Sequence, residues 1–406
     1  MDDHGNVWRQ TTKLATADGE SKAESIMPET TDQNAWRQKM PRQANPQRKA
    51  RVEDRNSQLD LLRSVAILMV VAYHLTQTSP KPLAALMSPI RVGEYGVDLF
   101  FVLSGWLIGG LYWREQARFG SVDLPRFWVR RWLRTIPPYL VALALAWMAV
   151  RVQRHDSFNW GYLFFIQNYY ERLPFFLVSW SLCIEEHFYV FVPLLLLWAR
   201  GRPWFMLVTC VSLIMAAPLC RCWLSQHGAI PEFGFKLTAT HLRLEGLLLG
   251  FSAAYVPVFS ASRWFSIQRF SRWVGAVSAA VLILIMMLTQ HQVWMYRIGL
   301  TALAALLTAV LIWLVEKTPG RISSSRLIKA IALSSYSVYL THALCLHMAR
   351  VIVGTMPAFI WFAYFPIATV LVVGGGAAFY FTVERTCIQM RDRLLPRRMG
   401  GGKSAS

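Results

Sequence analysis

Charged residues are scarce in this chain of 406 residues: they make up 16% of it, against about 25% in an ordinary soluble protein. Acidic residues are the rarest of them, with 23 Asp and Glu against 42 Lys and Arg. Hydrophobic residues reach 54%, and the mean hydropathy is +0.33. This composition excludes an ordinary water-soluble enzyme. The arginines interrupt long apolar runs instead of lining one polar surface, so we expect no nucleic-acid partner.

Several common chemical motifs are also missing from the sequence. The six cysteines form no disulfide framework, and Cys220 and Cys222 make a lone C-x-C with no second pair at metal-ligand spacing. There is no His/Cys/Asp array, no phosphate-binding glycine loop and no Gly-x-Ser-x-Gly elbow. We therefore expect neither a metal site nor a bound cofactor. The first apolar run starts near Leu61, too far along for the apolar part of a cleavable signal peptide.

Long apolar runs are what the sequence has in abundance. Residues 1–58 are polar, and we expect them to form a disordered cytoplasmic tail. Apolar stretches of a length that can cross a bilayer as helix then recur ten times. We expect spans at 62–79, 96–113, 136–152, 174–199, 204–220, 242–259, 274–290, 298–315, 327–349 and 359–382. The prediction is an all-α, polytopic membrane domain over 59–385, followed by a basic cytoplasmic tail over 386–406.

The basic residues give these spans an orientation. Cytoplasmic loops of membrane proteins collect Lys and Arg. With the N-terminus inside, the cytoplasmic segments carry 31 of the 42 basic residues, and all external loops and span edges carry ten. We therefore expect about ten transmembrane helices with both termini in the cytoplasm, in the inner (plasma) membrane.

The first span carries two basic residues on one face. Arg63 and His74 are eleven positions apart, which leaves them about 20° apart around a helix and ~16 Å apart along it. Arg63 then lies at the cytoplasmic end and His74 deep in the membrane, with Asp60 one turn before Arg63. The simpler interpretation is that Arg63 extends to the membrane surface and His74 hydrogen-bonds a neighbouring helix.

The loop before the third span carries a stripe of arginines. Arg126, Arg130 and Arg134 recur at four-residue intervals, which predicts one face of a short interfacial helix. Anchoring by positive charge explains such a stripe adequately. The functional alternative is a site for a polyphosphorylated cytosolic ligand, because guanidinium groups match phosphate oxygens.

Acidic residues inside the spans need an explanation, because ionisable groups in a bilayer are costly and usually mark a functional site. Asp98 opens the second span, and an unpaired carboxylate there would be expensive. Glu185 and Glu186 interrupt the fourth span, and their helix positions point about 100° apart, so they cannot serve one site equally. Arg243 and Glu245 open the sixth span, where they could neutralise each other.

Together these residues resemble the first-helix signature and later motifs of membrane acyltransferase family three. The matching segments are Asp60 to His74, Gly96 to Ile108, Arg126 to Pro138, Trp180 to Tyr189, Arg243 to Leu247 and Ser335 to His342. Six motifs in the family's order make the resemblance specific. Two departures stand out: Thr386 replaces the usual proline of Glu-Arg-Pro, and Thr341 replaces an aromatic residue before His342.

The resemblance implies an enzyme that O-acylates bacterial surface glycans, with acyl-coenzyme A as donor and a carbohydrate or glycolipid as acceptor. Acetyl is the expected acyl group. Some members carry an additional extracytoplasmic hydrolase-like domain. The resemblance here ends near residue 385, so we expect transfer to be completed in the membrane domain or by a separate partner.

The resemblance and the spacing agree on one mechanism. Donor phosphates would bind Arg63 and the stripe of Arg126, Arg130 and Arg134, and the thioester would reach His74. His74 would act as general base on the acceptor hydroxyl, because imidazole titrates near neutrality. An acyl-histidine intermediate is the alternative.

Further residues are assigned around this centre. Asp98 or Glu185 would orient His74, and we place Asp60 and Arg243 among the substrate-binding residues. The rival function is a proton-coupled transporter or a lipid or glycan flippase that uses Glu185, Glu186 and His74. Inverted repeats would favour the rival, and the sequence has no corresponding halves.

Overall fold

The computed structural model describes residues 56–79, 93–154, 157–171, 173, 175–198, 203–226, 235–354 and 362–395. These residues form helices and turns, with no strand among them, so the predicted all-α polytopic fold is confirmed. Most of the expected N-terminal tail and the end of the basic C-terminal tail lie outside the described residues. Residues 386–394, at the beginning of the expected C-terminal tail, are helical.

Nine helical segments of the described chain are long and apolar enough to cross a membrane. The main helices are α3 (Ser57–Thr78), α5 (Gly96–Phe119), α6 (Leu124–Arg154), α7 (Trp180–Trp198), α8 (Pro203–Gln226), α12 (Trp264–Met287), α14 (Leu300–Leu314), α15 (Arg326–Gly354) and α16 (Tyr364–Phe379). Short α13 (His291–Trp294) and a π-helical turn, η7 (Met295–Gly299), lead into α14. A second π-helical turn, η9 (Tyr380–Glu384), joins α16 to α17 (Arg385–Leu394).

The sixth expected span, 242–259, is shorter than predicted. It divides into α10 (Glu245–Ala253) and α11 (Val256–Phe259), after a 3₁₀ turn, η5 (Thr240–Leu242). The carbonyl of Leu242 accepts a hydrogen bond from the Arg221 guanidinium at 2.5 Å instead of continuing a helix. The α-helix therefore begins only at Glu245.

The arginine-rich segment before the third span is not a separate interfacial helix. It forms the first turns of α6, which continues through Pro137 and Pro138. Proline removes helical hydrogen bonds, so neighbouring helices must hold such a segment together. Thr135 bonds to Glu186 of α7 at 3.0 Å, and the Tyr336 hydroxyl of α15 donates to the Thr135 carbonyl at 2.8 Å.

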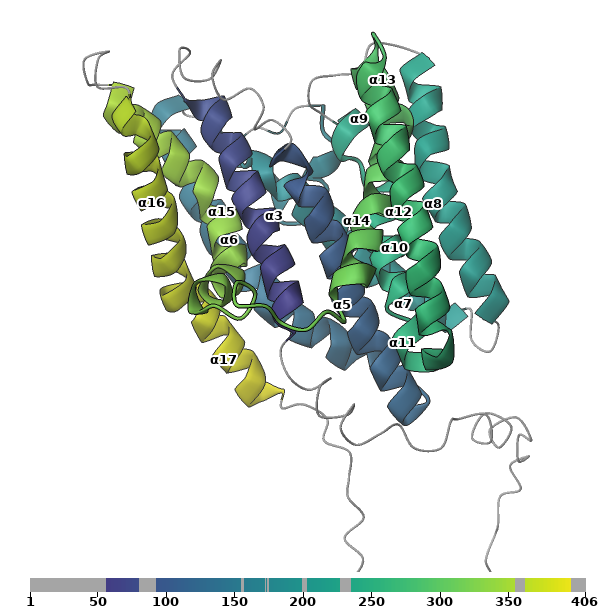
Figure 1. Ribbon diagram of the computed structural model, residues 1–406. Helices are drawn as coiled ribbons and strands as arrows, with labels where there is room; N and C mark the ends of the chain where they lie inside the picture. The colour runs from purple at the N-terminus through teal and green to yellow at the C-terminus, as the bar shows by residue number, and fades with distance from the viewer. Residues whose placement is uncertain are drawn as a thin grey trace, which may run out of the picture. The chain divides into compact units, whose positions relative to one another are not determined.

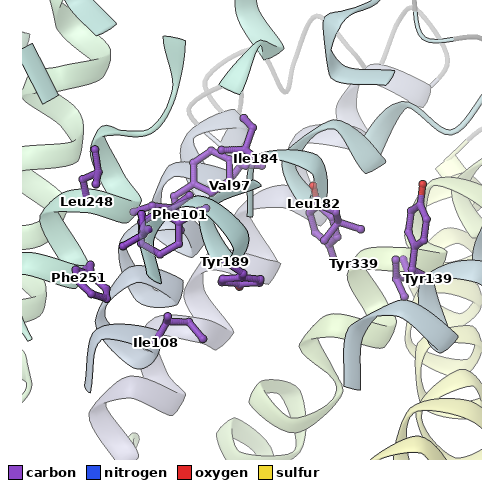
Figure 2. Packing of buried hydrophobic residues seen from close by; sticks show 14 of the residues in the cluster. Val97, Phe101, Ile108, Tyr139, Leu182, Ile184, Tyr189, Leu248, Phe251 and Tyr339 are labelled. Carbon is purple, nitrogen blue, oxygen red and sulfur yellow. The ribbon is translucent and has the colours of Figure 1, made fainter. Parts of the chain in front are cut away.

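Helix α3 packs between α5 and α15, and Figure 1 shows it between these two helices. The main apolar cluster joins α5, α6, α7, α10 and α15, and members from each of these helices are labelled in Figure 2. Glycine allows α5 and α10 to touch backbone to backbone. A Cβ at Gly105 would lie 2.1 Å from the Leu247 carbonyl oxygen, and one at Gly250 would lie 2.2 Å from that of Val102.

Two ion pairs cross between helices in the interior. Arg221 of α8 is fully buried and lies 2.7 Å from Glu245 of α10, which also accepts a hydrogen bond from Thr301 of α14 at 2.8 Å. Arg243 lies 2.9 Å from Asp98 of α5. The pair that we expected between Arg243 and Glu245 is therefore replaced by two pairs with other helices. Each pair neutralises charges that would otherwise be costly in the apolar interior.

We predict that Arg221→Met lowers the stability of the protein strongly, because Glu245 would be left as a buried unpaired charge. Breaking such a pair costs about 3–5 kcal/mol, whereas replacing both partners with apolar residues is often neutral. The melting temperature of the detergent-solubilised protein should fall in Arg221→Met and recover in the double variant with Glu245→Leu. Arg272→Met, which changes an exposed arginine of α12, is the control. Equal melting temperatures for Arg221→Met and the control would contradict the pairing.

Candidate active site

A pocket opens between α3, α5, α6, α7 and α15. Its volume is about 830 Å³, including the space that is open to solvent at its mouth. Its basic and acidic lining residues are Arg63, Arg131, Arg134, Glu185 and Glu186. Hydroxyl groups line it too, from Ser104, Thr135, Ser181, Ser335, Tyr336 and Tyr339. Four of the ionisable residues singled out in the sequence thus meet in one place: Arg63, Arg134, Glu185 and Glu186.

Glu185 is held by three neighbours. Ser104 of α5 donates to it at 3.0 Å and Tyr189, one turn along α7, at 2.5 Å. The guanidinium of Arg131 lies 3.8 Å away, donates to the Tyr189 hydroxyl and covers the Tyr189 ring at 4.4 Å. Because its neighbours already engage it, this carboxylate is suited to fixing the position of Arg131.

Glu186 faces a different helix, as the angular offset between adjacent helix positions predicts. The Trp132 indole donates to it at 3.1 Å and the Thr135 hydroxyl at 3.0 Å, both from α6. The two adjacent acids therefore tie α7 to α5 and α6 separately. Both still line the pocket.

The three arginines of the predicted stripe lie in different surroundings. Arg134 lines the pocket, where Glu384 attracts it and Arg131 repels it. Arg130 instead contacts the C-terminal helix, through Asp392 at 3.3 Å and the Leu395 carbonyl. Arg126 begins α6 beside Asp123 and does not line the pocket. The stripe thus contributes one of its three members to the pocket, and Arg131, which is offset from it, contributes another.

His74 lies on the same helix as Arg63, as predicted, but not among the pocket-lining residues. Its Nδ1 is 2.9 Å from the carbonyl oxygen of Val70. A carbonyl can only accept, so Nδ1 carries the proton in the neutral ring and the Nε2 lone pair is available as a base. The side chain is half-buried.

The neighbour of His74 is another histidine. The ring centroids of His74 and His342 are 4.9 Å apart, with the planes at 71°. His342 belongs to α15 and is fully buried, and its ring lies 5.7 Å from that of Tyr339, which lines the pocket. Ring contacts thus connect the pocket-lining Tyr339 to His74 through His342.

The remaining predicted site residues lie elsewhere. Asp98 pairs with Arg243, whose guanidinium also covers the Trp180 ring at 5.3 Å. Asp60 is buried at the start of α3. None of Asp60, Asp98 and Arg243 lines the pocket. Within the described chain, the carboxylates proposed to orient His74 have other hydrogen-bond partners: Arg243 for Asp98, and Ser104 and Tyr189 for Glu185.

Sequence reasoning gave no role to several residues of this site. Arg131 was hidden beside a more regular stripe, and Tyr339 and His342 were noted only as part of the matching segment Ser335 to His342. Glu384, fully buried at the π-helical turn η9, accepts from Ser337 at 2.5 Å. The sequence did contain a signal that His342 lies near Tyr339: the two residues are three positions apart, which places them on one face of the same helix.

Comparison with known proteins places this geometry in context. Residues 56–381 match the family described as "Acyltransferase domain". A Staphylococcus aureus (strain COL) protein named as a candidate O-acetyltransferase is 28% identical over 335 residues, covering 75% of this chain and 53% of that protein. The peptidoglycan O-acetyltransferase OatA of Listeria monocytogenes is 27% identical over 345 residues, covering 78% and 53%. The O-acetyltransferase OatA of S. aureus (strain NCTC 8325) is 29% identical over 313 residues, covering 70% and 49%.

The chain spans about half the length of the curated relatives that it matches. No solved structure matches it. The family match covers all the helices that line the pocket, from α3 through α15. The chain therefore belongs to this acyltransferase family, as a multi-pass membrane protein.

Proposed function

We propose that the protein transfers an acetyl group from cytosolic acetyl-coenzyme A to a hydroxyl of an extracytoplasmic carbohydrate, in the inner (plasma) membrane. The observation that carries this proposal is the arginine-lined pocket, from which Tyr339 and His342 lead to His74. O-acetyl transfer is the activity in the names of the relatives, and one of those names gives peptidoglycan as the acceptor.

The basic end of the pocket suits the phosphates of the donor. Arg63, Arg131 and Arg134 come from two helices and converge on one space. A guanidinium group can donate two parallel hydrogen bonds to the oxygens of one phosphate, and it keeps its positive charge when it is partly desolvated. Glu185 and Tyr189 hold Arg131 in place, which lowers the conformational entropy that it would lose on binding.

The distance between the two ends suits the length of the donor. Arg63 and His74 are separated by ~16 Å of helix rise, so a donor bound by its phosphates must extend its pantetheine arm inward to place the thioester near His74. Apolar side chains such as Phe100, Leu103 and Leu182 line the same pocket and would limit the access of water to the thioester.

The chemistry requires a base and a route for the acceptor. His74 Nε2 would take the proton of the acceptor hydroxyl as the oxygen attacks the thioester carbonyl, and the sulfur would leave with the electron pair of the C–S bond. The Val70 carbonyl holds the Nδ1 proton and so selects the tautomer in which Nε2 is free. His74 is only half-buried, so part of its side chain is exposed, and the acceptor would approach it there.

We expect His74→Ala to abolish acetyl transfer while the protein still folds and inserts. Removal of a general base typically lowers the rate by about 10²–10⁴. The measurement is transfer of radiolabelled acetyl from acetyl-coenzyme A to the glycan fraction of inverted membrane vesicles. A His74→Ala protein that transfers acetyl at the normal rate would refute this mechanism, and proton-coupled transport by that variant would favour the transporter or flippase.

We expect Arg63→Ala to raise the KM for acetyl-coenzyme A about tenfold or more with a smaller effect on kcat, because a phosphate partner is lost and the base remains. High donor concentration should therefore restore activity in Arg63→Ala but not in His74→Ala. Arg272→Ala, on the exposed face of α12, is the control. Equal loss of kcat in both site variants would show that Arg63 does not serve donor binding.

The orientation of the donor site gives a further expectation. Reporter fusions should place residues 114–135 and the C-terminus in the cytoplasm and residues 153–173 outside, because positive charge concentrates in the former segments. A cytoplasmic signal from residues 153–173 would put Arg63 and Arg134 on the wrong side for a cytosolic donor.

A further inference from the structure

His342 carries one of the nine buried side-chain atoms that lack a hydrogen-bond partner among the described residues. Its side chain is fully buried, and its Nε2 has no hydrogen-bond partner among the described residues. A buried polar atom without a partner costs free energy, and the large majority of such atoms in proteins are paired. A histidine that served only to join helices would use this nitrogen in an inter-helix hydrogen bond. His342 makes none.

The protonation of the ring follows from its other nitrogen. Nδ1 lies 2.7 Å from the Tyr339 carbonyl oxygen and 3.2 Å from that of Val338, both in the same helix. These carbonyls can only accept, so Nδ1 bears the proton and Nε2 holds a free lone pair in the neutral ring. His74 has the same arrangement with Val70. Two bases of identical tautomer thus lie with ring centroids 4.9 Å apart.

The position of His342 relates it to both substrates of the proposed reaction. Its ring lies between His74 and Tyr339, 5.7 Å from the latter, and Tyr339 lines the donor pocket. In the proposed reaction His74 takes the acceptor proton, whereas the thiolate forms at the end of the pantetheine arm, which enters from the pocket that Tyr339 lines. A proton therefore has to move from one side to the other before the thiol can leave neutral.

We propose that His342 is the proton acceptor that links His74 to the departing donor, an inference that rests on the proposed function. The acceptor O–H bond breaks and its proton moves to His74 Nε2 as the new C–O bond forms and the C–S bond breaks. The proton then passes from His74 Nε2 to His342 Nε2 and on to the coenzyme A thiolate, which leaves as the free thiol. Both rings return to the neutral Nδ1–H form.

The test is a variant that removes only the unpaired Nε2 of His342. In His342→Asn the side-chain amide can still donate to the Tyr339 carbonyl as Nδ1 does, but no group takes the place of Nε2. We expect kcat for acetyl transfer to fall at least tenfold, with the KM for acetyl-coenzyme A and the melting temperature of the protein close to wild type. His347→Asn, an exposed histidine five positions along the same helix, should leave kcat unchanged.

A second measurement separates a proton relay from a packing role. Because His342 receives its proton only through His74, His342→Asn should slow the residual reaction of His74→Ala no further. An independent structural contribution would instead multiply the two losses. If His342→Asn proves too unstable to assay, His342→Gln is measured in the same way.

The outcomes distinguish this inference from the function on which it rests. Absence of acetyl transfer by the wild-type protein in vesicles that hold its acceptor would overturn the proposed function itself. An active wild type together with a normal kcat in His342→Asn, or multiplying losses in the double variant, would overturn the relay alone.

Discussion

The need to pair buried charges within the protein determines how the pocket is built. No water reaches most of the interior of a membrane domain, so each carboxylate and guanidinium needs a protein partner. Glu185 and its neighbour Glu186 meet this need with side chains of α5 and α6, and the contacts fix three helices around one space. The pocket is the space that these polar contacts keep open, since apolar side chains alone would pack to close it.

The same requirement explains why the second set of charges lies outside the pocket. Asp98 with Arg243 and Glu245 with Arg221 form neutral pairs that join α5, α8 and α10. Neither pair leaves a cation available for a phosphate. By contrast, Arg134 lines the pocket, where Glu384 attracts it and Arg131 repels it. The distribution of carboxylates thus separates structural arginines from those suited to a donor.

Much of this architecture was predictable from the sequence, because length and hydropathy determine membrane helices almost alone. The shared face of Arg63 and His74 followed from helix periodicity, and the separate roles of Glu185 and Glu186 followed from their angular offset. What the sequence could not supply was the contacts between helices. Nothing local distinguishes Arg131, which lines the pocket, from Arg130, which contacts the Leu395 carbonyl, or assigns His342 to His74 across 268 positions.

The proposed reaction gives each of the two histidines a separate task. In the proposed reaction, a cytosolic donor and an extracytoplasmic acceptor would approach from opposite sides, so the reacting atoms would meet inside the membrane domain. The Val70 carbonyl holds the His74 ring by Nδ1, which leaves Nε2 as the nitrogen that would take the acceptor proton. The Tyr339 carbonyl holds the His342 ring in the same way. In the proposed relay, the unpaired Nε2 of His342 is the position that would receive the proton from His74.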